Sequence, residues 1–180
     1  LCSHAAYPEF KKQGAGKVIN IGSMMSIFAA SFAPAYAASK GGIVQFTKSC
    51  ANAWAKDNIQ VNSVLPGWID TDLTIKAREQ VKGLHESVLA RTPAGRWGKP
   101  DDHAGIAIFL ASPASDFVTG TAIPVDGGFS IQISTVIPIN FDRGALFYSS
   151  FHFIEAGIEG DGSATVKKNH RGKQPSWVSY

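Results

Sequence analysis

The stretch Ile59-Gln-Val-Asn-Ser-Val-Leu-Pro-Gly67 indicates the fold most directly. Residues 59–65 are a short run with many apolar and β-branched side chains, and Pro66-Gly67 is a turn signal that ends it. We predict a strand over Ile59–Leu65. The run Lys17-Val-Ile-Asn-Ile21 has the same character and is typical of a buried strand in a parallel sheet.

Segments with a helical pattern lie between these two predicted strands and between the second of them and a third predicted strand. Between Tyr36 and Lys56, residues such as Lys40 and Ile43 recur at steps of three and four, which predicts one face of a long helix. The remaining elements follow in order: a charged helical segment at Thr74–Arg91, a helix after Pro100-Asp101-Asp102 with Ile106, Phe109 and Leu110 on its apolar face, and a strand at Thr121–Val125 that ends at Asp126-Gly127-Gly128.

Strands that alternate with helices predict an α/β fold with a parallel sheet. Three strands leave much apolar surface open, so we expect more chain before residue 1. The chain would then be the C-terminal part of a doubly wound parallel-sheet fold whose N-terminal half is missing. We predict a partial domain at 1–133 and an atypical, mobile C-terminal tail at 134–180, with a basic run at Lys167–Lys173. Within the tail, 134–153 contains enough apolar residues to form a hairpin or to pack locally.

Composition excludes several classes of function. The chain has 180 residues, 44% of them hydrophobic and 17% charged, and no apolar run approaches the roughly 20 residues of a membrane span. A net charge of +3 does not favour nucleic acid as a partner. Cys2 and Cys50 are too few for a disulfide framework or a zinc site, and the histidines are scattered, so we predict no metal site and a cytoplasmic location.

Tyr36-Ala-Ala-Ser-Lys40 places a phenol and an amine one helical turn apart on the same face. A nearby cation favours the phenolate form, which lets a tyrosine exchange a proton with an alcohol or carbonyl oxygen at neutral pH. The pattern alone also fits an ordinary surface pair. Ser23 follows the strand that ends at Ile21, at the edge where α/β folds bind ligands, and its hydroxyl can bond a substrate oxygen. Ser26 is the alternative.

Four motifs, in order and spacing, resemble the short-chain dehydrogenase/reductase family over roughly residues 1–131. They are Asn20-Ile-Gly-Ser23, Tyr36-Ala-Ala-Ser-Lys40, Gln60-Val-Asn-Ser-Val-Leu-Pro-Gly67 and Val125-Asp-Gly-Gly128. The resemblance implies a Rossmann-type fold, an NAD or NADP cofactor, and hydride transfer between the nicotinamide and a secondary alcohol or ketone. It also implies a homodimer or tetramer, built partly on helices at Leu1–Lys12 and Pro34–Lys56.

The family pattern implies a role for individual residues. Tyr36 would be the general acid/base, Lys40 would assist it and bond the nicotinamide ribose, and Ser23 would orient the substrate. The cofactor-binding residues would be Tyr36 and Lys40 with Pro66, Gly67, Ile69 and Thr71. The Gly-x-x-x-Gly-x-Gly phosphate loop of the family is not found in the sequence, so the phosphate-binding half of the site would lie outside it.

The substrate is indicated more weakly. Arg91-Thr-Pro-Ala-Gly-Arg-Trp-Gly98 and Pro100-Asp101 resemble bacterial sugar and sugar-acid dehydrogenases that act on 2-deoxygluconate or gluconate. Arg78, Lys82 or His85 could meet a carboxylate, or they could simply face water. Asn62 and Trp54 are more consistent with structural roles.

Two alternatives stay open. One is a non-catalytic fragment that associates with an intact subunit of the same family. The other is an epimerase or dehydratase of the wider Tyr-x-x-x-Lys superfamily, although such relatives lack the Pro-Gly and Asp-Gly-Gly motifs in this arrangement.

Overall fold

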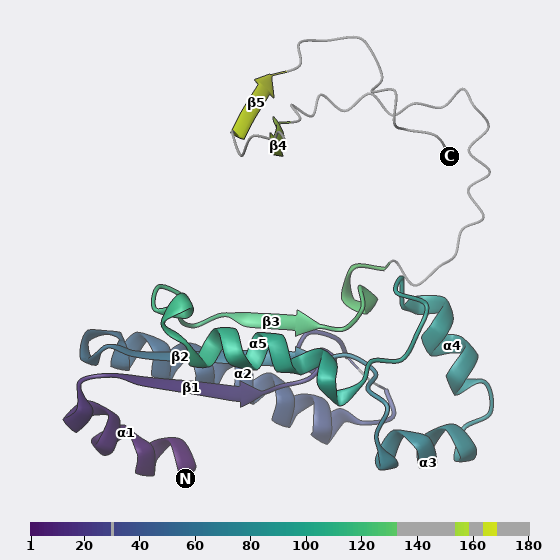
Figure 1. Cartoon of the computed structure of the whole chain (residues 1–180). Coiled ribbons are helices and arrows are strands. Elements are labelled where there is room, and N and C mark those ends of the chain that lie inside the picture. Colours follow the sequence, from purple (N-terminus) through teal and green to yellow (C-terminus); the bar gives the residue numbers. More distant parts are fainter. Residues whose placement is uncertain (30, 133–153, 159–163, 169–180) are drawn as a thin grey trace. The chain divides into compact units, whose positions relative to one another are not determined.

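The computed structural model describes residues 1–29, 31–132, 154–158 and 164–168. The chain divides into two compact units, Leu1–Val136 and Ile137–Tyr180, which we describe separately. The first unit contains a three-stranded parallel sheet in the order β1-β2-β3, with helices on both faces (Figure 1). This arrangement confirms the predicted α/β fold class.

The central strand β2 (Ile59–Pro66) positions the rest of the sheet. Its residues are buried from Ile59 to Leu65, because strands flank it on both sides and helices cover it. The strand β1 (Gly16–Ile21) pairs with it from Gly16↔Ile59 to Ile21↔Val64. The strand β3 (Ala122–Val125) pairs with its second half, from Ser63↔Ala122 to Pro66↔Val125. All three strands lie within one residue of the predicted segments.

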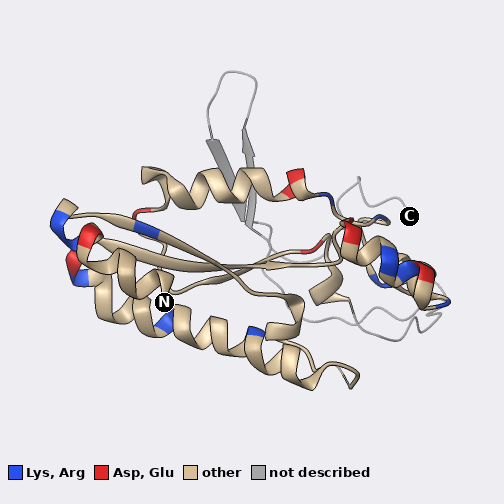
Figure 2. Ribbon diagram, turned by 90° about the horizontal axis from the view of Figure 1, so that it is seen from below, with Lys and Arg blue, Asp and Glu red and all other residues tan. Residues whose placement is uncertain are grey.

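Helices α1 (Cys2–Gln13) and α2 (Pro34–Trp54) lie on one face of the sheet, and α5 (Ala104–Ala111) lies on the other (Figures 1 and 2). Pro34 is suited to the first turn of α2, where a backbone N–H has no partner within the helix. A short 3-10 helix, η2 (Ala55–Asp57), continues from α2, so the predicted helix over Tyr36–Lys56 differs only at its ends.

The segment predicted as one helical stretch at Thr74–Arg91 forms two helices, α3 (Asp72–Gln80) and α4 (Leu84–Arg91). The break has a local cause: Gly83 adopts a left-handed conformation with φ of 80° and precedes the first turn of α4. Many of the residues on this pair of helices are charged (Figure 2). The described residues of the first unit form four more 3-10 helices: η1 (Met24–Ser26), η3 (Pro100–His103), η4 (Pro113–Ser115) and η5 (Phe129–Ile131).

Two apolar clusters hold the helices against β2. The first contains Cys50, Ala51, Ile59 and Val61, with Tyr7, Phe10, Val18 and Trp54 packed around it. Trp54 stacks on Tyr7 with ring centroids 4.9 Å apart, which agrees with its predicted structural role. The second contains Met24, Leu65 and Phe129, with Phe28, Val44, Trp68 and Ala122 against it. This second cluster lies at the carboxyl end of the strands and therefore anchors the segment that follows β1.

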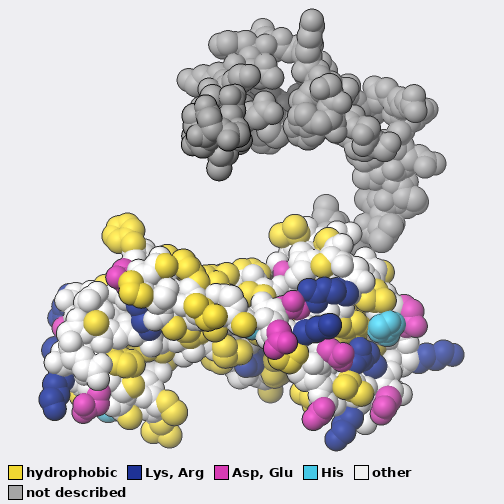
Figure 3. Space-filling model, in the orientation of Figure 1, with side chains coloured by type: hydrophobic (Ala, Val, Ile, Leu, Met, Phe, Trp, Pro, Cys, Tyr) yellow, Lys and Arg dark blue, Asp and Glu magenta, His cyan; other side chains and the backbone are white. Residues whose placement is uncertain are grey.

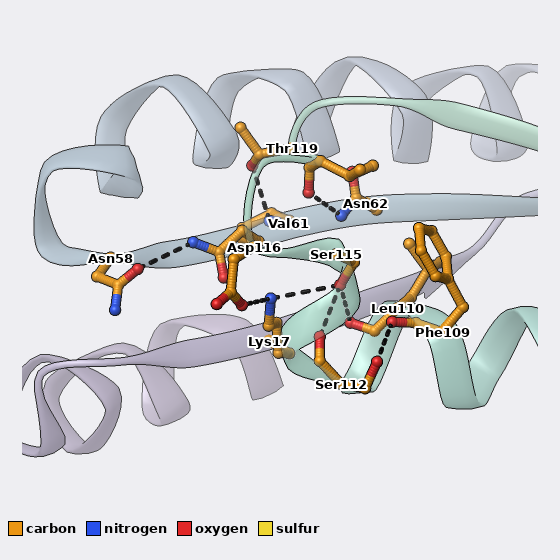
Figure 4. Close-up of polar contacts among 12 residues, drawn as sticks. Lys17, Asn58, Val61, Asn62, Phe109, Leu110, Ser112, Ser115, Asp116 and Thr119 are labelled. Atoms are coloured by element: carbon orange, nitrogen blue, oxygen red, sulfur yellow. Dashed lines mark hydrogen bonds and ion pairs between the residues drawn. The ribbon is translucent and has the colours of Figure 1, made fainter. Parts of the chain in front are cut away.

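Polar side chains join the loop before β3 to the sheet (Figure 4). The Asn62 side chain donates to the Val118 carbonyl at 2.7 Å and accepts from the Thr121 N–H at 3.2 Å. Lys17 Nζ forms an ion pair with Asp116 at 2.6 Å. The backbone contacts of Asn62 confirm that it is a structural residue.

Apolar surface stays open on the first unit. Helix α5 has no charged residue, and only Leu110 among its residues is buried; Ile108 is 70% exposed. Hydrophobic side chains gather over this part of the visible face (Figure 3). Among the described residues, only β2 pairs with β1, so the other edge of β1 presents backbone groups without a strand partner.

The second unit contains an antiparallel pair, β4 (Ile154–Ile158) and β5 (Ala164–Lys168), in the register Ile154↔Lys168. Two strands therefore occur where no regular structure was predicted. The predicted mobility of 134–180 and the local packing of 134–153 concern residues outside the described ones. No helix in the described parts of the chain has the length and apolarity to cross a membrane.

Candidate active site

The carboxyl ends of β1 and β2 meet at one edge of the sheet, where open α/β sheets bind ligands. Ser23 lies just beyond β1 and caps η1, where its Oγ accepts from the Met25 N–H at 3.2 Å. The Gly22 N–H donates to the Val64 carbonyl at 2.8 Å, which ties this segment to β2. The Ser23 hydroxyl donates to no described residue, so its proton is available to a ligand.

Tyr36 and Lys40 lie on successive turns near the start of α2. Lys40 Nζ donates to the Ile21 carbonyl at 3.0 Å and lies 5.7 Å from the centroid of the Tyr36 ring. Tyr36 is 48% exposed, so its side chain is open to solvent. The bond to Ile21 places the ammonium group at the end of β1, two residues before Ser23. The fold therefore places the Lys40 ammonium group beside Tyr36 and at the end of the strand that Ser23 follows.

Ser26, the alternative to Ser23, has a different environment. Its Oγ accepts from the Ser23 N–H at 3.2 Å and donates to the Lys40 carbonyl at 2.7 Å. The Ser26 hydroxyl proton is thus already used, and the side chain links the segment that carries Ser23 to the helix that carries Tyr36 and Lys40. Ser26 is a tether between the two parts of the site, which the sequence pattern did not reveal.

Gly67 packs closely against the end of β3. Its N–H donates to the Val125 carbonyl at 3.0 Å, and a Cβ on Gly67 would lie 2.7 Å from Cα of Asp126. The sequence suggested that glycine here admits a ligand near the backbone. In the structure, Asp126 occupies the space that a side chain at position 67 would need.

The segment after Gly67 presents the Ile69 backbone toward the sheet edge. The parallel bridge between Ile69 and Gly98 uses the Asp70 N–H, bonded to Gly98 O at 2.8 Å, and the Gly98 N–H, bonded to Trp68 O at 2.9 Å. In such a bridge the N–H and carbonyl of Ile69 itself point away from Gly98. The Ile69 carbonyl accepts from Thr74, while its N–H donates to no described residue.

Thr74 organises this segment and was not predicted as a functional residue. Its Oγ1 donates to the Ile69 carbonyl at 2.6 Å and accepts from the Thr71 N–H at 2.9 Å. The Thr71 and Thr74 hydroxyl oxygens are 3.3 Å apart. Thr74 therefore fixes both Ile69 and Thr71, the two residues of the segment that the sequence placed against a cofactor.

An aromatic cluster joins α3, α4 and the segment around Trp97. The Trp97 indole N–H donates to His85 Nδ1 at 3.1 Å, and the Trp68 and Trp97 rings meet edge to face at 5.6 Å. The Arg78 guanidinium lies 4.4 Å from the Trp97 ring centroid and forms an ion pair with Asp70. Arg78 and His85, proposed from the sequence as contacts for a carboxylate, thus already have partners in the protein.

A cavity of about 220 Å³ lies beside the predicted cofactor segment, and none of Ser23, Tyr36 and Lys40 lines it. Its walls include Trp68, Ile69 and Gly127, with the Arg96–Asp102 pair at one side. Arg96 holds Asp102 through two bonds of 2.7 and 2.9 Å, which keeps the pKa of this carboxyl well below its usual range. The charged groups of Arg96 and Asp102 are thus engaged with each other.

Other ligand types find little support in the described part of the chain. No group of three or more His, Cys, Asp or Glu residues there could hold a metal ion, and both cysteines are free thiols. A parallel sheet covered on both faces, with a hydroxyl, a phenol and an ammonium group at its carboxyl edge, defines a class of α/β protein with a candidate site for proton transfer.

Comparison with known proteins agrees with this class. The model of a family described as "Enoyl-(Acyl carrier protein) reductase" matches residues 1–130. The 2-dehydro-3-deoxy-D-gluconate 5-dehydrogenase of Bacillus subtilis is 50% identical over 118 residues, which are 66% of this chain and 46% of the relative. The enzyme of the same name from Escherichia coli is 48% identical over 128 residues, 71% of this chain and 50% of the relative.

A solved structure of gluconate 5-dehydrogenase from Burkholderia cenocepacia, in complex with NADP and tartrate, has a TM-score of 0.70 and 40% identity. The match covers 73% of this chain and 51% of that one. The chain belongs to the short-chain dehydrogenase/reductase family. It spans about half the length of the curated relatives that it matches.

Proposed function

We propose that this chain carries the proton-transfer part of an active site that oxidises a secondary alcohol, or reduces the ketone, with NAD or NADP. The observation that carries the proposal is the position of Lys40. Its ammonium group is bonded to the carbonyl at the end of β1, one turn from Tyr36 and next to the segment of Ser23. This is the arrangement that a phenol needs to act as an acid/base at neutral pH.

Each residue would act on the oxygen of the substrate. The Ser23 hydroxyl has its proton available and would donate a hydrogen bond to that oxygen. The Tyr36 phenol would give a proton to the oxygen during reduction and take it back during oxidation. The positive charge of Lys40 would stabilise the phenolate between these steps. When bound, the nicotinamide supplies or accepts the hydride.

The residues at the sheet edge fit a nicotinamide cofactor. The Ile69 N–H is directed away from Gly98 and is available to a carboxamide oxygen, and the Thr74 hydroxyl holds the Ile69 carbonyl in place. Pro66 and Gly67 begin the segment, and Thr71 ends it at the start of α3. Lys40 has further donors for a ribose hydroxyl. NAD and NADP both remain candidates.

A sugar acid is the substrate class that we propose. Its support is the similarity to enzymes named for 2-dehydro-3-deoxy-D-gluconate and for gluconate. In this proposal the complete enzyme is a homo-oligomer of the cytoplasm that binds neither nucleic acid nor membranes.

A second candidate function is association with an intact subunit of the family, without catalysis by this chain. The open edge of β1 and the exposed apolar residues of α5 favour it, because such surfaces in a stable protein are usually covered by another segment. The matched part is 50% of the E. coli relative, so an intact subunit would bring the other half of the family's chain to such a complex.

The test measures binding of NADH and NADPH to the 180-residue chain by fluorescence titration, followed by gluconate-dependent reduction of NAD and NADP at 340 nm. We expect Tyr36→Phe to lower turnover by about 10²–10⁴-fold, the usual contribution of a general acid/base, with nearly unchanged cofactor affinity. Retained turnover in Tyr36→Phe would refute the assignment. Lys40→Met should weaken cofactor binding as well.

Absence of cofactor binding up to millimolar concentration would refute autonomous activity and favour the second candidate. Co-elution of the chain with the intact E. coli relative, and a change in the turnover of that enzyme, would then support association. Elution of the two proteins at their separate positions would exclude this partner.

A further inference from the structure

Arg91, the last residue of α4, has an unusual environment. Its guanidinium carbon lies 5.2 Å from the centroid of the Phe28 ring and 4.1 Å from that of the Phe129 ring. Phe28 belongs to the segment that begins at Ser23, and Phe129 follows β3. Arg91 therefore lies over the apolar cluster at the carboxyl end of the sheet, on the side that carries the candidate active site.

The charge of Arg91 has no anionic partner in the described part of the chain. Its Nε is buried and makes no hydrogen bond there. The ion pairs of the described residues involve Lys11, Lys17, Arg78 and Arg96, and none involves Arg91. A buried guanidinium donor without a partner costs free energy, and contacts with two aromatic rings offset only part of that cost. Only Nε of the Arg91 donors is shut off in this way, so an anion would meet the outer Nη groups of the guanidinium.

The other cationic groups of this region are less suited to that task. Arg78 is paired with Asp70, and the His85 ring accepts the Trp97 N–H through Nδ1. Lys76 on α3 and Lys82 in the turn between α3 and α4 are both exposed. Arg91 is thus the cation of the α3–α4 region that combines a buried donor with a position over the cluster around Met24, Leu65 and Phe129.

We propose that Arg91 recognises the carboxylate of a sugar-acid substrate and so determines specificity for acids over neutral polyols. The proposal rests on the function proposed above, since Ser23 and Tyr36 would act on a carbon of the same molecule. A guanidinium suits this role because its planar donors match the two oxygens of a carboxylate, and because the flanking Phe28 and Phe129 rings restrict its orientation.

The direct test follows the side-chain Nε–H resonance of Arg91 by NMR in the 180-residue chain. D-gluconate and D-glucitol are the probes, because they differ only by a carboxylate in place of a hydroxymethyl group. We expect a saturable shift with sodium gluconate, and none with D-glucitol or with sodium chloride at the same ionic strength. Arg91→Gln assigns the resonance by its disappearance. An Nε–H resonance that does not shift with gluconate, or that shifts equally with glucitol or chloride, would overturn the proposal.

Variants separate Arg91 from its neighbours. Loss of a charged hydrogen-bonding group should weaken gluconate binding about 10- to 100-fold in Arg91→Gln, and Arg91→Lys should recover only part of the affinity. Lys82→Gln removes the same charge from the same region and should bind gluconate as the unmodified chain does. If Lys82→Gln weakens gluconate binding and Arg91→Gln does not, the carboxylate is bound by Lys82 instead of Arg91.

This binding readout requires neither cofactor nor turnover, so its result is independent of the turnover assay. A chain that binds gluconate through Arg91 without turnover would contradict the proposed chemistry and keep the site. If both Arg91→Gln and the unmodified chain turn over substrate, and their preference for gluconate over glucitol is the same, the proposed carboxylate site would be wrong and the proposed chemistry would stand.

Discussion

Replacement of Gly67 by alanine is expected to destabilise the protein by about 1–3 kcal/mol, the usual cost of added volume in a well-packed region. The added Cβ would lie 2.7 Å from both Cα and Cβ of Asp126 and 3.2 Å from its carbonyl oxygen. These atoms cannot rotate away, because the Asp126 carboxylate accepts from the N–H groups of Gly128 at 3.0 Å and Ser130 at 2.7 Å. The ends of β2 and β3 would have to separate.

The assay is equilibrium unfolding in urea without cofactor, with Gly42→Ala as the matched control. Gly42 lies on the exposed side of α2, and a Cβ there would meet nothing within 4 Å. Alanine at position 42 should therefore leave stability unchanged or raise it by up to about 1 kcal/mol through helix propensity. If Gly67→Ala unfolds at the same urea concentration as the unmodified chain, packing against Asp126 does not explain the glycine, and contact with a ligand becomes the better explanation.

Two further predictions concern polar contacts. Ser26→Ala should lower stability by about 1–2 kcal/mol and speed hydrogen exchange at the Ser23 amide, because the Ser23 N–H and the Lys40 carbonyl both lose a partner. Unchanged exchange would contradict the role of Ser26 as a tether; Ser26→Thr, which keeps the hydroxyl, is the control. For Asp57, the bond donated by the Tyr7 hydroxyl, with help from the nearby Lys11 ammonium, lowers the pKa of the carboxyl. A carboxyl with a lowered pKa stabilises the folded protein above its ordinary pKa of about 4, and this stabilisation is lost as the pH falls further. The melting temperature of Asp57→Asn should therefore fall less steeply below about pH 4 than that of the unmodified chain. Identical dependence of the melting temperature on pH in the two proteins would refute this contribution.

The periodicity of apolar residues and the turn signals in the sequence correctly predicted the strands and the long helix of the first unit. Ile59–Leu65 is a buried strand because its apolar and β-branched residues suit the centre of a parallel sheet. The spacing of Tyr36 and Lys40 needs only a helix, and α2 provides it. The break between α3 and α4 was missed, since Gly83 can either continue a helical stretch at some cost or cap a new helix.

Contacts between distant segments could not be predicted from these patterns. Ser26 and Lys40 are on different elements, and the pattern gives no register between η1 and α2. Gly67 and Asp126 meet only because β2 and β3 pair. Such contacts depend on how elements pack, whereas sequence periodicity reports only which face of an element is apolar.

The supports of the candidate site divide into two groups. The segment of Ser23 and the side chain of Lys40 are held by bonds within the first unit: the Gly22 N–H to Val64, Ser26 to the Lys40 carbonyl, and Lys40 to Ile21. Their arrangement therefore needs no added partner. The groups that remain open are the second edge of β1 and the apolar residues of α5, which lie outside this network. A partner that covers them would act mainly on stability and on cofactor affinity. The positions of the Ser23 segment and of the Lys40 ammonium group should therefore be the same in the isolated chain and in any complex.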